Sequence, residues 1–354
     1  MDTHTLDFII RHCGIDALGV VRAEPMMTLD TYHAWVQAGV PEGLQYLVRH
    51  EACRRSFDAL LPQTKSVLCA AVCLPPASAG WARFCAIGDY HKVVRDKLAS
   101  LEKALRQIGL IRGESRICVD SAPLLERELA VRAGLGWIAH HHQLVHPEYG
   151  TGIVLGELLL TDDLSEYASV IRWHTIPFRP ESLIPGSRCV CRSRRCCEQF
   201  CPTRALAHGQ YRVERCLAYW TTQHAGVLDE YYAAAMGNCV WGCDACQIHC
   251  PVAKYHKSPE TPFPYHRLTP DVVLTASAKQ LTRLLEGTPM HAAHPRILQR
   301  NYCYVIGNTQ NCAYIPLLSW VLQNNPSAWV QHAASRSLRM LQGDDLSVMP
   351  PKQG

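Results

Sequence analysis

The sequence predicts an α/β (α+β) domain first, then a ferredoxin-like domain with two iron–sulfur clusters, and last an all-helical unit. Three observations predict this order. Helix and strand patterns alternate over residues 1–176, paired cysteine–proline runs occupy residues 177–262, and helical periodicity alone follows over residues 263–354. The 354 residues are enough for two or three domains with sizeable cores.

The first region carries its elements in alternation. Helical faces are predicted over residues 6–13, where Leu6, Ile9, Ile10 and Cys13 align, and over the charged segment 95–108. Short apolar runs predict strands at residues 66–74, 117–119 and 152–160. Alternation of this kind is typical of layered α/β architecture.

The cysteine spacing of the second region is that of a protein with two iron–sulfur clusters. The bacterial ferredoxin run is C-x2-C-x2-C-x3-C-P, and its fourth cysteine serves the other cluster. CDACQIHCP at 243–251 matches the later part of such a run, and CEQFCP at 197–202 ends an earlier one. Two neighbouring clusters would make a path for single electrons.

The rule that the fourth cysteine of each run ligates the other cluster assigns the ligands. One cluster would be held by Cys201, Cys216, Cys243 and Cys246. The other would take Cys191, Cys197 and Cys250, but the spacing puts its remaining ligand at Arg194. The substitutes that the sequence offers are Cys189, Cys196 and Cys239. Without one of them this cluster would be incomplete, labile or absent.

Zinc and disulfides are the alternatives for these cysteines. C-x2-C pairs also bind zinc, but zinc sites usually show two separated pairs and not C-x3-C-P endings. Disulfide frameworks are typical of small secreted domains, and this chain is long. Iron–sulfur ligation is therefore favoured. The cysteines in apolar runs, such as Cys69, Cys73 and Cys303, are expected to be buried thiols.

The segment VDSAPLLEREL at 119–129 places an acidic residue between a strand and a helix. Pro123 suits a first helical turn, so the helix is expected to begin there. Asp120 would then lie at the carboxyl end of a strand, where α/β sheets place ligands. The pattern alone favours a helix cap by Asp120 or Ser121, because such caps are common.

The last region shows helical stripes without strands. They are predicted at Leu281, Leu284 and Leu285, at Ile297, Leu298, Tyr302 and Val305 before Gly307-Asn308, and at residues 316–322 and 330–341. Helix pairs joined by short loops suggest a small HEAT-like unit.

Composition indicates an ordinary soluble protein of the reducing cytoplasm. Hydrophobic residues make up 48% and charged residues 19%, the net charge is +4, and there are 18 cysteines. Such a charge does not by itself indicate a nucleic-acid partner. No apolar stretch approaches the roughly 18 residues of a membrane span, so no membrane association is expected.

Arginines are dense around the first cysteine run. Seven lie between residues 188 and 215, namely Arg188, Arg192, Arg194, Arg195, Arg204, Arg212 and Arg215. They could form a phosphate-binding face, or they could compensate the charge of thiolate-rich clusters. Tyr219, Trp220 and Trp241 are interpreted as packing around the clusters rather than as base-stacking platforms.

Several blocks of the chain resemble the epoxyqueuosine reductase (QueG-type) family. They are GLQYLVRHEACRR at 43–55, GDYHKVVRDKL at 88–98, the block from VDSAPLLEREL to LLLTDDL at 119–164, MGNCVWGCDACQIHCP at 236–251 and LQRNYCYVIGN at 298–308. The resemblance covers nearly the whole chain. It implies a cobalamin-binding domain over residues 1–176, a ferredoxin-like domain with two [4Fe–4S] clusters over 177–262, and a HEAT-like ending over 263–354.

The resemblance also implies a reaction. Family members reduce epoxyqueuosine to queuosine at the wobble position of tRNA, with cobalamin and two [4Fe–4S] clusters, and share this machinery with reductive dehalogenases. It implies that Asp120 is the proton donor, which would require a raised pKa. The implied cobalamin contacts are Tyr90, His91, Asp120, Ser121, Trp137, His140, His141 and His142. The implied partners are tRNAs with GUN-type anticodons and a flavodoxin or ferredoxin system as electron donor, and we expect a monomer.

The chain departs from the family at three places. Ala139-His140-His141-His142 stands where the family has Gly-Lys-Asn-Thr, Arg194 replaces a cysteine, and Pro289-Met290-His291 replaces a basic pair. Three consecutive histidines could form a metal site, but neighbouring residues of a strand point to opposite faces, so the run is interpreted as a polar loop. Two alternative functions stay open: a related corrinoid reductase acting on a small molecule, and a non-catalytic electron carrier or corrinoid-binding relative.

Overall fold

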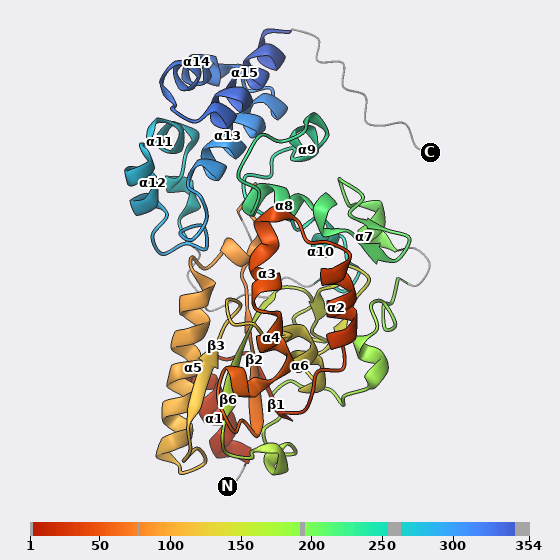
Figure 1. Ribbon diagram of the computed structural model, residues 1–354. Helices are drawn as coiled ribbons and strands as arrows, with labels where there is room; N and C mark the ends of the chain where they lie inside the picture. The colour runs from red at the N-terminus through yellow and green to blue at the C-terminus, as the bar shows by residue number, and fades with distance from the viewer. Residues whose placement is uncertain (1–2, 77, 192–194, 254–262, 344–354) are drawn as a thin grey trace. The chain divides into compact units, whose positions relative to one another are not determined.

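The computed structural model describes residues 3–76, 78–191, 195–253 and 263–343 (Figure 1). The chain divides into two compact units. The first comprises Met1–Pro76, Asp89–Cys197 and Cys246–Thr261, and the second comprises Ala77–Gly88, Glu198–Ala245 and Pro262–Gly354. The cysteine-rich region therefore contributes residues to both units.

A four-stranded sheet in the order β1-β2-β6-β3 is the centre of the first unit. Its strands are β1 Ala17–Arg22, β2 Ser66–Cys73, β3 Ser115–Cys118 and β6 Ile153–Leu160. The strands predicted at 66–74, 117–119 and 152–160 are thus confirmed, whereas β1 was not predicted. All three pairings are antiparallel. The sheet is therefore of the α+β kind, because doubly wound α/β sheets are mostly parallel.

Helices cover both faces of this sheet. The helices of the unit are α1 Thr3–His12, α2 Leu29–Gln37, α3 Gln45–Arg49, α4 Glu51–Arg55, α5 Tyr90–Gln107 and α6 Glu126–Arg132. Helix α5 runs alongside the sheet in Figure 1, and its Val94 and Leu98 lie against Gly156 of β6. Leu129 of α6 packs on the opposite face with Cys69 of β2. Because both faces are covered, every residue of β2 is buried.

The start of α6 differs from the prediction. The helix begins at Glu126, three residues after Pro123, and its N-cap is Leu125, which makes no side-chain capping bond. Neither Asp120 nor Ser121 caps the helix. The intervening residues form a non-helical turn, in which Ser121 N–H donates to the carbonyl of Val119. A β-hairpin of β4 Trp137–Ile138 and β5 Leu144–Val145 follows α6.

The second unit is mostly helical. Its helices are α8 Leu217–Thr222, α9 Glu230–Ala235, α11 Pro270–Thr275, α12 Ala278–Leu284, α13 Arg296–Asn308, α14 Ile315–Asn324 and α15 Ala328–Gln342. A small hairpin joins β7 Leu206–Ala207 and β8 Gln210–Tyr211. Two short helices, α7 Cys196–Gln199 and α10 Ala245–Ile248, occur where the chain passes from one unit to the other.

The predicted helices of the last region are confirmed, with one correction. Leu281 and Leu285 are buried, but Leu284 is 37% exposed and does not belong to the buried stripe. Helix α13 ends at Asn308, as predicted for the Gly307-Asn308 pair. Gly307 also lets α15 approach closely, since a Cβ there would lie 2.5 Å from Oγ of Ser337. Among the described residues, no helix is long and apolar enough to cross a membrane.

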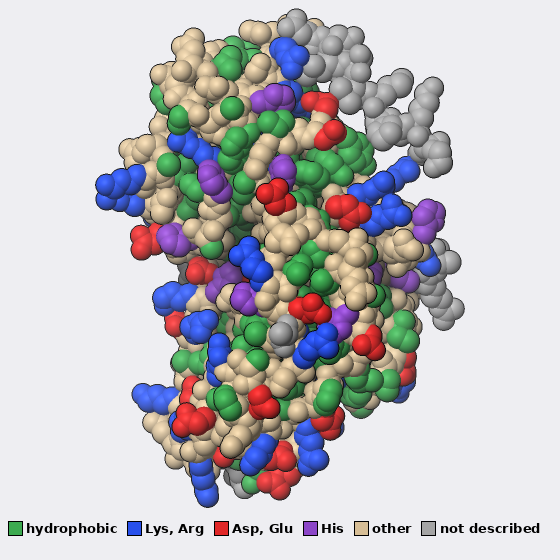
Figure 2. Space-filling view, viewed as in Figure 1, with side chains coloured by type: hydrophobic (Ala, Val, Ile, Leu, Met, Phe, Trp, Pro, Cys, Tyr) green, Lys and Arg blue, Asp and Glu red, His purple; other side chains and the backbone are tan. Residues whose placement is uncertain are grey.

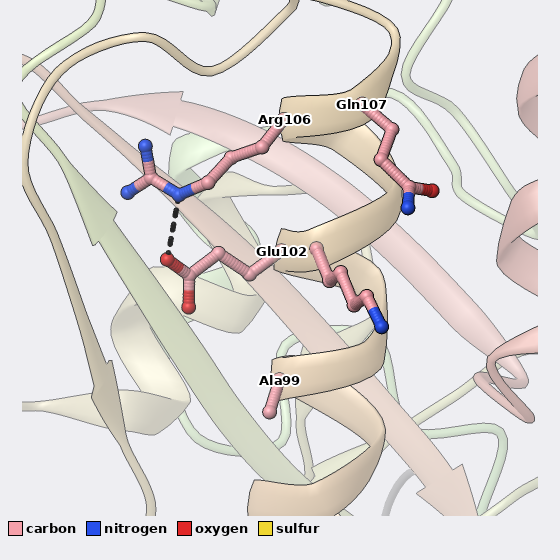
Figure 3. A pocket seen from close by; sticks show the side chains of 5 residues that line it. Ala99, Glu102, Arg106 and Gln107 are labelled. Atoms are coloured by element: carbon pink, nitrogen blue, oxygen red, sulfur yellow. Dashed lines mark hydrogen bonds and ion pairs between the residues drawn. The ribbon is translucent and has the colours of Figure 1, made fainter.

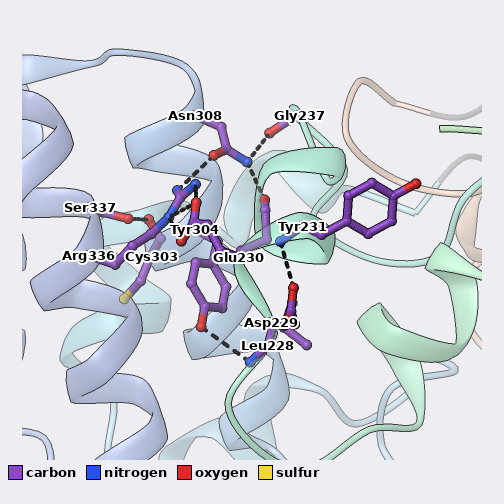
Figure 4. A network of polar contacts seen from close by, with 11 residues as sticks. Leu228, Asp229, Glu230, Tyr231, Gly237, Cys303, Tyr304, Asn308, Arg336 and Ser337 are labelled. Carbon is purple, nitrogen blue, oxygen red and sulfur yellow. Dashed lines mark hydrogen bonds and ion pairs between the residues drawn. The ribbon is translucent and has the colours of Figure 1, made fainter. Parts of the chain in front are cut away.

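Buried polar contacts attach the last helices to α9 (Figure 4). Arg336 of α15 is 2% exposed and pairs with Glu230 at the start of α9, with Nε to Oε1 at 3.0 Å. Its Nη1 donates to Oδ1 of Asn308 at 2.8 Å, and Nδ2 of Asn308 donates to the carbonyl of Ala233 at 2.7 Å. These contacts satisfy the buried guanidinium and link three helices.

Candidate functional site

Asp120 lies immediately beyond β3, on the turn that leads to α6. Its φ is +48°, a left-handed conformation that is uncommon for a residue other than glycine. Its backbone N–H donates to Oε1 of Glu126 at 2.6 Å. Residues in such sparsely populated backbone conformations cluster at functional sites. The side chain is 56% exposed, so its carboxylate is accessible from solvent.

His91 bridges two carboxylates at this turn. Its Nε2 lies 3.1 Å from Oδ2 of Asp120, and its Nδ1 lies 2.7 Å from Oδ1 of Asp89, the N-cap residue of α5. Ionised carboxylates only accept hydrogen bonds, so both ring nitrogens carry protons and the imidazole is charged. The Tyr90 hydroxyl also hydrogen-bonds to Asp120, and the Tyr90 and His91 rings stack with centroids 4.0 Å apart.

The pKa of Asp120 is lowered, whereas the role of proton donor had predicted a raised pKa. The surrounding protein raises it, but the hydrogen bond and charge of His91 and the hydrogen bond from Tyr90 outweigh that effect and lower the pKa below its ordinary value. Burial lowers the pKa of His91, but the bonds to Asp120 and Asp89 outweigh burial and raise it. Asp120 is therefore ionised, and the proton of the pair resides on His91.

A second pair of acids lies next to this turn and was not predicted from the sequence. Glu157 of β6 is fully buried and stands opposite both Cys69 and Cys118, on the face that α6 covers. Burial raises the pKa of both Glu157 and Glu126; the Glu126 carboxyl adds to this effect on Glu157, and the Asp120 carboxylate adds to it on Glu126. The pair thus retains a proton. One signal could have shown it, because Glu157 is a charged residue inside an otherwise apolar strand.

The predicted cobalamin contacts Trp137 and His141 carry buried N–H groups. Nε1 of Trp137 and Nε2 of His141 have no hydrogen-bond partner among the described residues. Nδ1 of His141 accepts from Gln143 N–H at 3.2 Å, which leaves Nε2 as the donor. Buried donors are normally satisfied, so these two fit a polar ligand such as the amide-bearing rim of a corrin. The residues present are therefore compatible with the cofactor.

The three histidines form the turn between β4 and β5, as predicted for a loop, but they do not face solvent together. His141 is 3% exposed. Burial and the neighbouring histidines lower the pKa of His141 to about 4, and burial and Arg127 lower that of His142 to about 4. Both are neutral at pH 7. His140 instead lies beside the cysteines Cys189 and Cys191.

Other surface features lie apart from this site. A groove of ≈ 500 Å³ follows the end of α5 remote from Tyr90 and is lined by Glu102, Arg106 and neighbouring side chains (Figure 3). It does not include Asp120 or His91. Basic and acidic side chains alternate on the face drawn in Figure 2, so this view shows no continuous basic surface.

The first cysteine group belongs to the first unit. Sγ of Cys189, Sγ of Cys191 and a ring nitrogen of His140 all lie within 4.8 Å of one another. The thiol of Cys250 acts electrostatically on Cys189, and the thiols of Cys191 and Cys196 act on Cys250. Cys197 is buried in α7. The structure thus brings together Cys191 and Cys250, which the spacing had assigned to one cluster.

Helix α13 holds two of the segments that carry the second cysteine group, which comprises Cys201, Cys216, Cys243 and Cys246. Arg300, fully buried, donates to the carbonyls of Trp220, His224 and Gly226 at 2.7–2.8 Å. Asn301 donates to the carbonyls of Thr221 and Val240 at 2.8 Å. These bonds fix α8, which follows Cys216, and the chain leading to Cys243. Cys239 hydrogen-bonds to Cys243, and Thr203 lies 3.9 Å from the Cys201 sulfur.

The aromatic residues near these cysteines are packing residues, as predicted. Tyr219 and Trp241 are buried, and the Trp220 ring stacks on Tyr232 at 4.3 Å. Of the arginines, Arg188 lies over the Trp137 ring at 5.2 Å. Arg192 and Arg194 lie outside the described residues.

Comparisons with known proteins agree with this arrangement. Residues 190–253 match a 4Fe-4S double cluster binding domain, and residues 54–121 match the family model of epoxyqueuosine reductase QueG. An epoxyqueuosine reductase of Vibrio cholerae is 30% identical over 332 residues, which cover 88% of this chain and 84% of the relative. One of Aliivibrio fischeri is 31% identical over 258 residues, which cover 68% of this chain and 64% of the relative.

Solved structures show the same fold. An epoxyqueuosine reductase of Bacillus subtilis, with its catalytic aspartate loop swung out of the active site, matches with a TM-score of 0.74 and 24% identity over 96% of this chain and 91% of that one. An epoxyqueuosine reductase with an epoxyqueuosine-modified tRNA-Tyr stem loop matches with a TM-score of 0.70 and 23% identity over 96% and 98%.

The fold and the cysteine runs define the class: an oxidoreductase that combines a double-cluster [4Fe–4S] binding domain with an antiparallel sheet carrying paired acids. The identity to the curated relatives extends over most of the chain. The chain belongs to the epoxyqueuosine reductase family.

Proposed function

We propose that this protein reduces epoxyqueuosine to queuosine at the wobble position of tRNA. The observation that carries the proposal is the Asp120–His91 pair at the end of β3, in a chain that belongs to this family. Removal of the epoxide oxygen as water, with formation of a double bond, consumes two electrons and two protons. The site must therefore hold protons close to the oxygen that leaves.

Bound [4Fe–4S] clusters would supply single electrons, and bound cobalamin would supply a low-valent metal that receives them. Cys201, Cys216, Cys243 and Cys246 would hold one cluster, and Cys191, Cys197 and Cys250 would hold the other together with a fourth ligand. Trp137 and His141 would bind cobalamin through their buried N–H groups. Tyr90, His91, Ser121, His140 and His142 stay predictions as cofactor contacts.

Asp120 delivers the proton as one half of a pair. His91 holds the proton at Nε2, and Oδ2 of Asp120 accepts it there at 3.1 Å. As negative charge develops on the substrate oxygen, the proton can move from His91 through the exposed Asp120 carboxylate. Asp89 stabilises the charged imidazole from the other side. General acid catalysis of this kind typically contributes about 10²–10⁴ in rate.

The Glu126–Glu157 pair supports the same site. It retains a proton in the sheet interior, and Glu126 holds the backbone of Asp120 by the 2.6 Å hydrogen bond. It therefore positions the Asp120 turn and is suited to hold the second proton of the reaction.

The remaining assignments follow from the proposed reaction. The substrate class is tRNA with GUN-type anticodons, and the electron donor is a flavodoxin or ferredoxin system. We propose a cytoplasmic monomer, a cobalamin-binding function for residues 1–176, and a HEAT-like arrangement of the final helices.

One experiment tests the proposal. Protein purified without oxygen is analysed for iron and sulfide, loaded with cobalamin, and assayed on an epoxyqueuosine-containing stem loop with a low-potential electron donor. We expect about eight irons per chain, from two cubane clusters, and conversion to queuosine by mass spectrometry. Zinc as the sole metal would refute the cluster assignment. Reduction of a small epoxide alone would indicate the corrinoid alternative, and no turnover with cofactors bound would indicate a non-catalytic relative.

A further inference from the structure

The first cysteine group is one ligand short by its spacing. Cys191, Cys197 and Cys250 occupy three ligand positions of the ferredoxin pattern, and Arg194 occupies the fourth. An arginine cannot ligate iron, because its guanidinium has no free lone pair at neutral pH. A fourth protein ligand must therefore come from another position in the chain.

The structure brings Cys189 to this place. Its Sγ lies within 4.8 Å of Sγ of Cys191, and the two thiols hydrogen-bond. Cys250 is close enough to act electrostatically on the Cys189 thiol. Cys189 is thus grouped with two of the three assigned ligands, although it lies outside the C-x2-C-x2-C-x3-C-P pattern.

A specific turn holds Cys189 in position. Its backbone N–H donates to the carbonyl of Gly186 at 3.0 Å, and Gly186 N–H donates to the carbonyl of Ile138 at the end of β4. Gly186 has φ +83°, and a Cβ there would lie 2.1 Å from the His140 ring. Only glycine therefore allows the ring and the turn to pack together.

His140 also contacts the sulfur of Cys189. Its main-chain N–H donates to Sγ of Cys189 at 3.3 Å, and a ring nitrogen lies within 4.8 Å of both sulfurs. Hydrogen bonds from N–H groups to cluster thiolates are among the factors that set the reduction potential of a cluster. Two departures from the family pattern, the histidine run and Arg194, thus concern the same cluster.

The other substitute cysteines are placed less favourably. Cys239 belongs to the second unit and hydrogen-bonds to Cys243, so it is engaged with the other group. Cys196 adjoins Cys197 at the start of α7 and affects Cys250. It is not part of the close group of His140, Cys189 and Cys191.

We propose that Cys189 is the fourth protein ligand of the first [4Fe–4S] cluster, in place of the cysteine absent from position 194. His140 is a positioning residue, whose main-chain N–H donates to the Cys189 thiolate and whose ring adjoins the ligand sulfurs. This inference rests on the proposed double-cluster function, and thiolate ligation agrees with the four cysteines that such clusters usually have.

Cys189→Ser tests the ligand, with Cys196→Ser as the matched control. Full-length proteins are purified without oxygen, and iron, sulfide and the EPR spectrum of the reduced protein are measured. We expect the iron content to fall from about eight to about four per chain in Cys189→Ser and to stay at about eight in Cys196→Ser. Retention of eight irons with an unchanged spectrum in Cys189→Ser, or loss in Cys196→Ser alone, would overturn the proposal.

A rescue variant separates lost ligation from lost folding. Cys189→Ser combined with Arg194→Cys restores the ferredoxin spacing, and we expect it to recover about eight irons and the wild-type melting temperature. If this double variant folds but stays at about four irons, Cys189 acts through structure and not as the ligand that replaces position 194. Wild-type protein with only four irons would instead refute the double-cluster premise itself.

His140→Ala distinguishes a positioning residue from a ligand. We expect full iron content and a shifted reduction potential for the first cluster, because the ring no longer adjoins the sulfurs. Pulsed EPR of the reduced wild-type protein should lack the strong nitrogen coupling of a coordinated imidazole. Iron loss in His140→Ala, or strong coupling that disappears on ¹⁵N-histidine labelling, would make His140 the ligand and contradict the assignment to Cys189.

Discussion

The Asp120 site and the cysteine groups are organised by different forces. Asp120 is held by hydrogen bonds to His91, Tyr90 and Glu126, all within the first unit, so its geometry is complete without a cofactor. The cysteines lie on turns and short helices, and their arrangement depends on the metal they would bind. The sheet would therefore preorganise the proposed proton transfer, whereas the proposed electron transfer would depend on assembly of the clusters.

Asp120→Asn should have the largest effect. Asparagine keeps the size of the side chain but cannot accept the proton that His91 holds. Turnover on epoxyqueuosine-containing tRNA should fall about 10²–10⁴-fold, the usual range for general acid catalysis. Iron content, cobalamin binding and melting temperature should stay at wild-type values. Asp96→Asn, on the exposed side of α5, is the control and should keep full turnover. Full activity in folded Asp120→Asn would end the proposal.

Arg300→Met tests the support of the second cysteine group. It leaves the carbonyls of Trp220, His224 and Gly226 without their donor in the protein interior. We expect a loss of about 3–5 kcal/mol in the free energy of unfolding, measured by denaturant titration, with a parallel loss of iron. Arg339→Met changes an exposed arginine of α15 and should cost no more than about 0.5 kcal/mol. Equal stabilities of the two variants would contradict the assignment.

His91→Gln should change the pH dependence of turnover. In the wild-type protein the pKa of His91 is raised, so the stored proton is present below that pKa and is lost as the pH rises through it. Turnover should decline on the alkaline side for the wild-type protein. His91→Gln should lack this decline and be slower at pH 7 by up to about 10²-fold. Identical pH profiles would show that His91 does not hold the proton.

Glu157→Gln tests the buried acid pair through stability. The pKa of Glu157 is raised in the folded state, so its stabilising contribution is present below the ordinary glutamate pKa of about 4.3 and is lost as pH rises through the folded value. The variant should therefore become progressively more stable than the wild-type protein with rising pH. The gain is about 1.4 kcal/mol for each tenfold difference in proton affinity between the folded and unfolded states. Glu166→Gln, an exposed control, should follow the wild-type curve.

Replacement of arginines in the 188–215 segment should give the smallest effect. Replacing Arg192 and Arg195 with alanine should weaken tRNA binding and reduce the slope of log affinity against log salt by about 0.7–0.9 per lost phosphate contact. Fluorescence anisotropy at several salt concentrations measures both. Unchanged affinity and slope would indicate that these arginines compensate the charge of the clusters and do not bind phosphate.

Much of the fold could be predicted because local patterns report burial directly. The apolar run at residues 66–74 and the helical stripe at residues 297–305 are periodic and long enough to identify. The start of α6 was predicted wrongly because Pro123 suits a helix start and also suits the turn that precedes one. The exposure of Leu284 could not be predicted because a helical stripe does not show where the neighbouring helix ends.

The sequence by itself determined the cysteine spacing, the family and the identity of Asp120, since these depend on residue types at fixed intervals. Only the tertiary structure decided how the charges are distributed. His91 lies at the start of α5 beside its N-cap Asp89, Asp120 follows β3, and Glu157 belongs to β6, so the effects of these three segments on one another's pKa exist only when the fold brings them together. The proposed ligand role of Cys189 also depends on the tertiary structure, because electrostatic and ligand interactions depend on distance in space and not on distance along the chain.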